Sequence, residues 1–202
     1  MSIKVIGLTG QSGAGKTTVS QIFSENGFAV INADKVARKV MEKGSSCLEK
    51  TCAVFGDVKD SDGNLDRKLL ASIVFTDMDK KKEYEGIIFP YITEEIEREI
   101  SDAEKNGDEY ILLDAPTLFE SGTDSLCSVI VSVICDREVR LARIISRDGI
   151  THQQAENRLN SQHSDDFYIL RSDYVIANDG TDDELSEKTR SVIKMIKERD
   201  NA

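Results

Sequence analysis

The sequence predicts an α/β fold with a doubly wound, parallel, five-stranded sheet, and three observations support this prediction. Five short runs rich in Val and Ile are continuously apolar rather than alternating, as expected for parallel strands that are covered on both faces. Helical stretches separate the runs, which is the pattern of successive βαβ units. A glycine-rich loop follows the first run and precedes the first helix, where α/β proteins commonly bind phosphates.

The strands and the helical segments between them divide the chain unevenly. The predicted strands are residues 3–8, 28–32, 110–114, 129–134 and 173–177. The gap after the second strand is too long for one crossover helix, and it holds helical candidates at 34–43, 45–55, 66–75 and 90–105. The sequence KDSDGN at 59–64 predicts a turn, Pro90 suits the first turn of the last candidate, and Gly107 suits its end. We therefore predict one domain over 1–202, comprising a core (1–34 and 109–202) and a helical insertion at about 35–108.

Composition limits the possible functions. A net charge of −11 argues against broad, nonspecific nucleic-acid binding. No apolar run approaches the roughly 20 residues that span a bilayer, and the opening MSIKVIGLTG contains no small-residue cleavage site. The four cysteines form no CxxC pair, and His152 and His163 have no companions at metal-ligand spacing. We expect a cytoplasmic protein with reduced thiols, no membrane segment and no nucleic-acid partner.

One segment is locally cationic. Residues 137–162 contain five arginines, no lysine and three acids. Arg140, Arg143 and Arg147 share one face of a predicted helix that Gly149 ends, and a second helix follows. A solvated amphipathic face is one interpretation. The other is an anion site, because the planar guanidinium fork suits phosphate oxygens.

The glycine-rich loop matches the phosphate-binding pattern G-x-x-x-x-G-K-[ST] from Gly10 to Thr17. Gly13 and Gly15 allow the backbone to wrap closely around phosphates. Lys16 is expected to reach the β and γ phosphates, and the Thr17 hydroxyl to ligate Mg²⁺. The residues expected to contact nucleotide phosphates are Gln11, Ser12, Gly13, Ala14, Gly15, Lys16, Thr17 and Thr18.

Two acids stand at predicted strand ends. Asp114 ends ILLD as a second candidate residue for the magnesium site, or as an ordinary strand-end acid. Asp34 follows the second strand, at the carboxyl edge where ligands gather in doubly wound sheets. A carboxylate there can orient an acceptor hydroxyl and take its proton, which leaves late in a loose phosphoryl transfer. Asp34 could also serve as a helix N-cap, and both roles could hold.

The reaction class follows by elimination. A GTPase should show Asp-x-x-Gly after a strand, whereas residues 114–117 read DAPT, and no Asn-Lys-x-Asp is present. A motor ATPase usually needs a larger chain or a lattice of partners. A small-molecule kinase remains, with a nonenzymatic ATP-binding regulator as the rival from another class.

Six motifs in order resemble the dephospho-CoA kinase family. They are GLTGQSGAGKTTV, INADKVARKV, FGD…DGNLDRKLLASIVF with FPYITEEI, LLDAPTLFESG, RIISRDGITHQQAENRLNSQ and DYVIANDGT, which together extend over nearly the whole chain. The resemblance implies a P-loop kinase core that uses ATP and Mg²⁺ to phosphorylate the ribose 3′-hydroxyl of dephospho-CoA, giving coenzyme A and ADP. It also implies a helical substrate-binding part and a helical lid at about 137–162.

The resemblance implies specific residue roles. Asp34 would be the base, with Lys16 and Arg143 as the other catalytic residues. Arg143 and Arg147 would clamp ATP phosphates from the lid, and Asn178 and Gly180 would lie near the adenine. The acceptor site would include Asp34, Arg38, Leu65, Asp66, Arg67 and Pro90.

The chain also departs from the family pattern. Gln11-Ser12 stands where the family usually has Gly-Ile, Asn32 replaces the first acid of Asp-Ala-Asp, and Phe89 replaces a common His. The last change puts a polar acceptor contact at that position in doubt. Another P-loop kinase, acting on a nucleoside monophosphate or a small hydroxylated metabolite, remains the nearest alternative. The sequence does not determine the oligomeric state.

Overall fold

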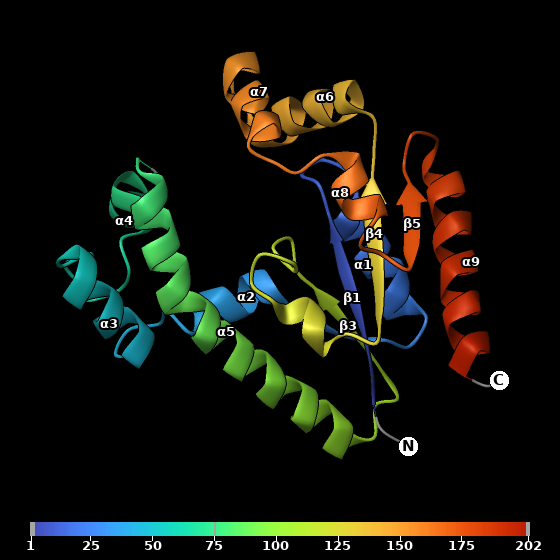
Figure 1. The fold of residues 1–202 in the computed structure, drawn as a ribbon, viewed down its shortest axis with the longest axis horizontal. Helices are drawn as coiled ribbons and strands as arrows, with labels where there is room; N and C mark the ends of the chain where they lie inside the picture. The colour runs from blue at the N-terminus through green and yellow to red at the C-terminus, as the bar shows by residue number, and fades with distance from the viewer. Residues whose placement is uncertain (1–2, 75, 201–202) are drawn as a thin grey trace. The chain divides into compact units, whose positions relative to one another are not determined.

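The computed structural model describes residues 3–74 and 76–200. Its sheet has the strand order β2-β3-β1-β4-β5; Figure 1 labels β1, β3, β4 and β5. The strands are β1 (Lys4–Gly10), β2 (Ala29–Asn32), β3 (Tyr110–Asp114), β4 (Val129–Ile134) and β5 (Tyr174–Ala177). β1 pairs in parallel with β3 and β4, and β4 pairs in parallel with β5. The five predicted strands are confirmed, although β1 continues to Gly10 rather than ending at residue 8.

Helices occupy most of the remaining chain. They are α1 (Lys16–Glu25), α2 (Ala33–Lys39), α3 (Ser46–Phe55), α4 (Arg67–Val74), α5 (Met78–Asn106), α6 (Arg137–Asp148), α7 (His152–Asn160), α8 (Asp165–Ile169) and α9 (Asp182–Asp200), with a 3₁₀ turn η1 at Thr123–Leu126. The predicted helix at 66–75 is confirmed as α4, but residue 75 lies outside the described residues. The chain divides into two compact units, one formed by residues up to Val30 and from Ala103 onward, the other by Ile31–Asp102.

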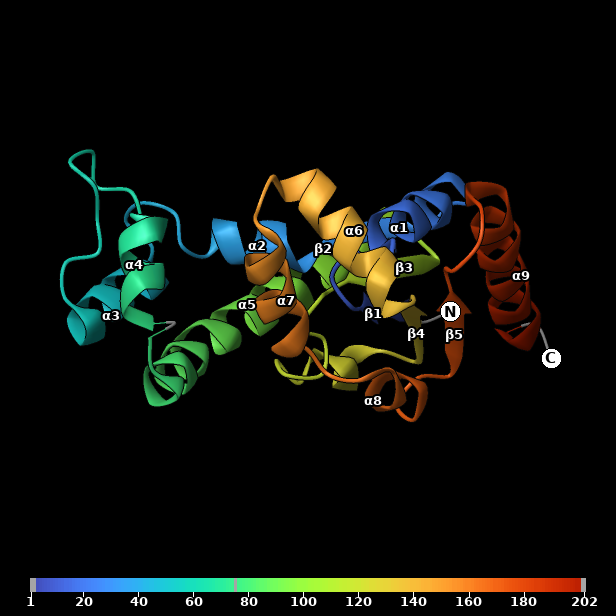
Figure 2. The ribbon, with the colours of Figure 1, turned by 90° about the horizontal axis from the view of Figure 1, so that it is seen from above.

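The core of the first unit lies where the sheet meets its covering helices. Ile6 and Leu8 of β1 and Val131 of β4 are completely buried, because they pack in one cluster with apolar residues of the helices that cover the sheet. Phe23 and Phe28 meet edge to face at 4.9 Å between ring centroids. Figure 2 shows α1 and α8 on opposite sides of the strands. Both faces are therefore covered, and the predicted doubly wound α/β fold is confirmed.

Helices α6 and α7 form a hairpin beyond the carboxyl end of β4 (Figure 1). The Asp136 carboxylate begins α6 by accepting a hydrogen bond of 2.8 Å from the Glu138 N–H. Gly149 ends α6 with φ +63°, so the predicted break there is confirmed. Thr151 and Gln154 form a capping box at the start of α7. The hairpin has its own apolar cluster, made of Leu141, Ile144, Ala155 and Leu159.

The second unit contains α2, α3, α4 and most of α5. The prediction that Pro90 opens the last helix is wrong, because α5 begins at Met78 and contains Pro90 in its interior. A proline inside a helix costs about 3 kcal/mol, but Ile87, Ile88 and Ile92 around it are buried. Each buried isoleucine contributes roughly 1.5–3 kcal/mol, so packing outweighs the proline. The predicted end at Gly107 is confirmed, since α5 stops at Asn106.

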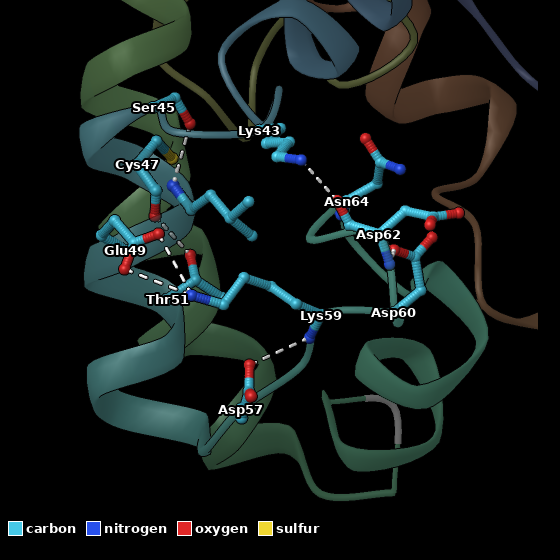
Figure 3. Close-up of polar contacts among 11 residues, drawn as sticks. Lys43, Ser45, Cys47, Glu49, Thr51, Asp57, Lys59, Asp60, Asp62 and Asn64 are labelled. Carbon is cyan, nitrogen blue, oxygen red and sulfur yellow. Dashed lines mark hydrogen bonds and ion pairs between the residues drawn. The ribbon is translucent and has the colours of Figure 1, made fainter.

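The segment between α3 and α4 is fastened by short-range polar contacts (Figure 3). The Asp60 carboxylate accepts hydrogen bonds from the Asp62 N–H at 3.0 Å and the Asn64 N–H at 2.9 Å. These N–H groups help to hold the pKa of Asp60 below its ordinary value, the Asn64 N–H contributing most. The Lys59 ammonium lies 3.2 Å from the Glu49 carboxylate. The backbone of Lys59 forms an isolated antiparallel β-bridge with that of Leu65. The predicted turn at 59–64 is therefore confirmed.

Candidate functional site

The loop between β1 and α1 has the backbone conformation of a phosphate cradle. Gly13 and Gly15 have φ values of +81° and +99°, a region that side chains rarely tolerate. A Cβ on Gly15 would lie 2.3 Å from Nδ2 of Asn178, and one on Gly10 would lie 2.3 Å from the Val133 carbonyl oxygen. Glycine is therefore needed in this loop because the backbone has positive φ values and because a Cβ at Gly10 or Gly15 would clash with neighbouring atoms. The predicted strand, loop and helix context is confirmed.

The start of α1 is suited to an anion. Gly15 is its N-cap residue, no side chain caps the helix, and its first turn contains no acid. The first N–H groups of a helix have no partners within the helix, and the helix dipole favours negative charge at this end. Thr17 and Thr18 are exposed on this turn. The geometry therefore directs N–H groups and a partial positive charge toward the place where phosphates are expected.

Lys16 and Asp114 form an ion pair between the loop and β3. The register explains their meeting, because Leu8, close to the loop, is the partner of Asp114 in the parallel pairing of β1 and β3. The side chains are 15% and 6% exposed respectively. Asp114 therefore lies beside the phosphate loop, and the Thr17 hydroxyl is exposed on the next helix. Oxygen donors of this kind fit Mg²⁺, which commonly takes one or two protein ligands and completes its shell with phosphates and water.

The segment after β5 is tied directly to the phosphate loop. The Asn178 side chain is buried, and its Nδ2 donates a 2.8 Å hydrogen bond to the Ala14 carbonyl. Gly180 leaves room for the Glu184 carboxylate, since a Cβ there would lie 1.8 Å from Oε2. Oε2 of Glu184 accepts a 2.8 Å bond from the Thr181 N–H and thereby fastens the start of α9. The structure thus places Asn178 on the loop, while Gly180 is exposed nearby in the chain.

The two arginines expected to bind ATP have different partners. Arg143 donates to the Gly13 carbonyl at 3.3 Å, and its guanidinium also lies 3.3 Å from Sγ of Cys135. Arg147 instead forms a bidentate pair with Asp148, at 2.7 and 2.9 Å. Arg158 binds the same carboxylate. Hydrogen bonding from Arg147, followed by that from Arg158, holds the pKa of Asp148 well below its usual range.

The other arginines of the cationic segment serve as internal connectors. Arg140 is only 6% exposed, and its Nε donates to the Cys135 carbonyl at 2.9 Å. It therefore does not belong to a solvated face with Arg143 and Arg147. Arg137 of α6 binds Glu156 of α7. Sequence spacing identified the helix face but could not show which cations have partners within the fold.

Gln11 makes a contact that sequence reasoning did not anticipate. Its side-chain nitrogen donates to Oδ1 of Asp165 at 2.8 Å and to the His163 carbonyl at 3.1 Å. Gln11 is 3% exposed. The partners are more than 150 residues away in the chain, and no local motif could have indicated them.

Asp34 and Arg38 belong to the second unit and lie on one face of α2. Asp34 is in the first turn and Arg38 is four residues later, and both are exposed. The suggestion that Asp34 caps this helix is wrong. Asn32 is the N-cap, and its side-chain oxygen accepts a 3.0 Å hydrogen bond from the Lys35 N–H. The Asp34 carboxylate is therefore not needed to begin the helix.

The remaining acceptor-site candidates lie at the start of α4 and on α5. The Asp66 carboxylate accepts from the Leu69 N–H at 2.9 Å, so it caps α4. Leu65 precedes it in the bridge to Lys59. Arg67, the first residue of α4, and Pro90 are both exposed. The structure thus gives Asp66 a structural role and leaves the Arg67 side chain exposed to solvent.

Other groups that could carry chemistry are engaged in packing. His163 stacks on Phe167 with ring centroids 3.7 Å apart and lies 3.3 Å from the Glu120 carboxylate. The four cysteines are free. Within residues 3–74 and 76–200, no group of three or more His, Cys, Asp or Glu side chains is arranged to hold a metal ion. No helix in that part of the chain is long and apolar enough to cross a membrane.

Comparison with known proteins gives a consistent result. A family model described as dephospho-CoA kinase matches residues 4–184. A dephospho-CoA kinase from Fusobacterium nucleatum is 42% identical over 197 residues, covering 97% of this chain and 100% of that protein. The solved dephospho-CoA kinase from Campylobacter jejuni has a TM-score of 0.72 and 27% identity, with 97% and 98% of the two chains covered. A shikimate kinase from Acinetobacter baumannii, at 16% identity, a TM-score of 0.53, and 98% and 95% coverage of the two chains, shares the fold.

Proposed function

The chain belongs to the dephospho-CoA kinase family, and from this premise we propose that it transfers the γ-phosphoryl group of ATP to the ribose 3′-hydroxyl of dephospho-CoA. The products are coenzyme A and ADP. The observation that carries the proposal is the loop at 10–15, whose glycine geometry leads into an uncapped helix beside the Lys16–Asp114 pair. Both substrates are small soluble anions, and we place the enzyme in the cytoplasm.

The phosphate loop binds and orients the triphosphate. Backbone N–H groups of the loop and of the first turn of α1 donate to phosphate oxygens, and Lys16 moves from Asp114 toward the β and γ phosphates. Thr17 and Asp114 would hold Mg²⁺, which supplies neutralisation of the charge that develops on the phosphates. Asn178 keeps the Ala14 carbonyl turned away from the phosphates by donating a hydrogen bond to it. The loop thus binds phosphate oxygens with donors already in position.

Asp34 acts on the acceptor. Its carboxylate orients the ribose 3′-hydroxyl and takes the proton as the oxygen–phosphorus bond forms and the bond to ADP breaks. A weak base is adequate, since the proton leaves late in a loose transition state. Arg38, on the same face of α2, together with Leu65, Asp66, Arg67 and Pro90, would position the anionic acceptor.

The arginines of the α6–α7 hairpin act on ATP. Arg143 already lies on the phosphate loop through the Gly13 carbonyl. We propose that it turns toward a phosphate oxygen and that Arg147 contributes from the same hairpin. Covering the phosphates in this way excludes water, which protects ATP from hydrolysis and strengthens the electrostatic contacts. Gly180, two residues after Asn178, would lie in the segment that packs on the adenine.

The decisive experiment is a coupled ADP-release assay with ATP and Mg²⁺, comparing dephospho-CoA, AMP, CMP and no acceptor. We expect release that depends on dephospho-CoA, with a product one phosphate heavier at the mass of coenzyme A. Release with another acceptor alone would assign a different kinase reaction. Nucleotide binding without any acceptor-dependent release would favour a nonenzymatic regulator.

Asp34→Asn tests the proposed base. The substitution keeps the size of the side chain but removes the charge, so kcat should fall about tenfold or more while ATP affinity stays near the wild-type value. Glu42→Gln, an exposed acid shortly after α2, is the matched control. Wild-type turnover by Asp34→Asn would remove Asp34 from catalysis.

Arg143→Ala and Arg147→Ala test the phosphate contacts. Each should raise KM for ATP, whereas Arg190→Ala, an exposed arginine on α9, should not. Unchanged kinetics in both hairpin variants would show that this helix face is a solvated surface that does not contact ATP.

A further inference from the structure

Gln11 is a buried polar side chain within the phosphate loop, and its amide has a fixed orientation. The two groups near its nitrogen, the Asp165 carboxylate and the His163 carbonyl, are both acceptors. The amide must therefore present its NH₂ to them, because the reversed orientation would bring three oxygens together. Its oxygen is buried without a hydrogen-bond partner among the described residues. The contribution of Gln11 thus comes from its N–H groups.

The two acceptors lie in the segment that returns the chain from the α6–α7 hairpin to the sheet. α7 ends at Asn160 and α8 begins at Asp165, so His163 belongs to the connector between them. Oδ1 of Asp165 is a carboxylate oxygen, and a hydrogen bond to a charged acceptor is stronger than one between neutral groups. Gln11 therefore fastens this connector to the phosphate loop.

The hairpin itself is held together internally. Its apolar cluster joins α6 to α7, and Arg137 binds Glu156 across the pair. Arg158 binds Asp148 at the far end. These contacts join α6 to α7, so the position of the pair depends on what holds its two ends.

Both ends of the hairpin are held at the phosphate loop. At the start, Arg143 donates to the Gly13 carbonyl at 3.3 Å, and the Arg140 backbone packs so closely that a Cβ on Gly13 would lie 3.0 Å from its carbonyl oxygen. At the return, the contact is made by Gln11. The loop that receives phosphates is thus the support from which the arginine-bearing hairpin is positioned.

We infer that Gln11 is a positioning residue that holds the α7–α8 connector against the phosphate loop and so sets the hairpin arginines for nucleotide binding. The inference rests on the proposed function of the hairpin as an ATP clamp. Gln11 itself exchanges no proton with the reactants. By restricting the hairpin to fewer positions before nucleotide binds, Gln11 lowers the conformational entropy that is lost on binding.

The test is a double-mutant cycle between Gln11 and Asp165, read out as affinity for the ATP analogue AMPPNP by calorimetry. Gln11→Met removes the donor while keeping the length of the side chain, and Asp165→Ala removes the charged acceptor. Each should weaken AMPPNP binding about 3- to 10-fold, in proportion to one lost hydrogen bond. The double variant should bind nearly as well as Gln11→Met, because the shared contact is lost only once.

Two further variants separate positioning from general stability. Asp165→Asn keeps an acceptor oxygen and should restore affinity to near the wild-type value. Gln21→Met, on the exposed face of α1 where the amide donates to Glu25, should leave binding unchanged. Melting temperatures are measured alongside. A Gln11→Met variant that melts earlier but binds AMPPNP normally, or a double variant whose losses add, would overturn the inference.

AMPPNP binding does not involve an acceptor, and this keeps the two conclusions separate. If dephospho-CoA is not phosphorylated but the cycle shows coupling, the proposed function fails and the role of Gln11 stands. If the reaction is confirmed and the cycle shows no coupling, only the inference fails.

Discussion

Replacing Lys16 with methionine should destabilise the protein as well as abolish phosphoryl transfer. The ammonium group pairs with the carboxylate of Asp114, a residue that is only 4% exposed. Methionine keeps the length of the apolar stem but removes the charge. The Asp114 carboxylate would then lose the nearby charge of Lys16, in a position where water can solvate it poorly.

The magnitude follows from burial. Removing one partner of a fully buried ion pair costs about 3–5 kcal/mol. The Lys16 side chain is 15% exposed, so solvent compensates in part and we expect about 2–3 kcal/mol. For a chain of this size each kcal/mol shifts the melting temperature by about 2–4 °C. The variant should therefore melt roughly 4–12 °C below the wild type.

Differential scanning calorimetry of the ligand-free protein is the assay, and two comparisons sharpen it. Lys194→Met breaks an exposed pair with Glu198, in which the side chains are 75% and 65% exposed, and should cost at most about 0.5 kcal/mol. The double variant Lys16→Met with Asp114→Leu should recover much of the loss, since apolar side chains of similar size can replace a buried pair. If Lys16→Met melts with the wild type, the ion pair contributes nothing and the reasoning is refuted.

Three further predictions concern local electrostatics, backbone conformation and thiol chemistry. The arginine partners of Asp148 lower its pKa, so the stability that its charge contributes is present above about pH 4 and is lost progressively as pH falls toward the lowered value. Protease protection of the hairpin should therefore be weaker in Asp148→Asn than in the wild type at pH 7, and the difference should shrink as pH falls below about 4; a difference that stays constant with pH would contradict this. Gly15→Ala should weaken AMPPNP binding at least about tenfold by calorimetry, because φ is +99° and the new Cβ would lie 2.3 Å from Nδ2 of Asn178; normal affinity would show that the loop adapts. Burial raises the pKa of Cys127 to about 12, so mass spectrometry should find it alkylated by iodoacetamide at pH 8 only after unfolding, and rapid labelling of the folded protein would show that this site opens.

The sheet and the phosphate loop were predictable because their determinants are local. A continuously apolar run such as YILLD can bury its side chains only when both faces of the strand are covered, and it forms β3 as predicted. The loop pattern encodes the required backbone angles directly in Gly13 and Gly15. Gly149 ended α6 where predicted, since a residue in the left-handed conformation is a common helix terminator.

The errors arose where a distant or competing interaction decided the outcome. The local preference of Pro90 predicts a helix start, but buried isoleucines on both sides continue the helix through it. The sequence allows Asp34 as a cap, but Asn32 lies in the N-cap position and accepts the hydrogen bond from the Lys35 N–H. The internal role of Arg140 depends on the hydrogen bond from its Nε to the Cys135 carbonyl. Neither spacing nor composition contains that information.

Charge explains how an acidic chain can serve an anionic ligand. The net charge of −11 is spread over the sequence, and exposed charges more than about 8–10 Å from the ligand are largely screened at physiological salt. The groups proposed to meet the phosphates would act at contact distance, and the Lys16 side chain is partly shielded from water. The first turn of α1 contains no acid, and Asp114 and Asp148 are each matched by basic side chains. Local arrangement, rather than total charge, therefore determines whether this loop attracts a nucleotide.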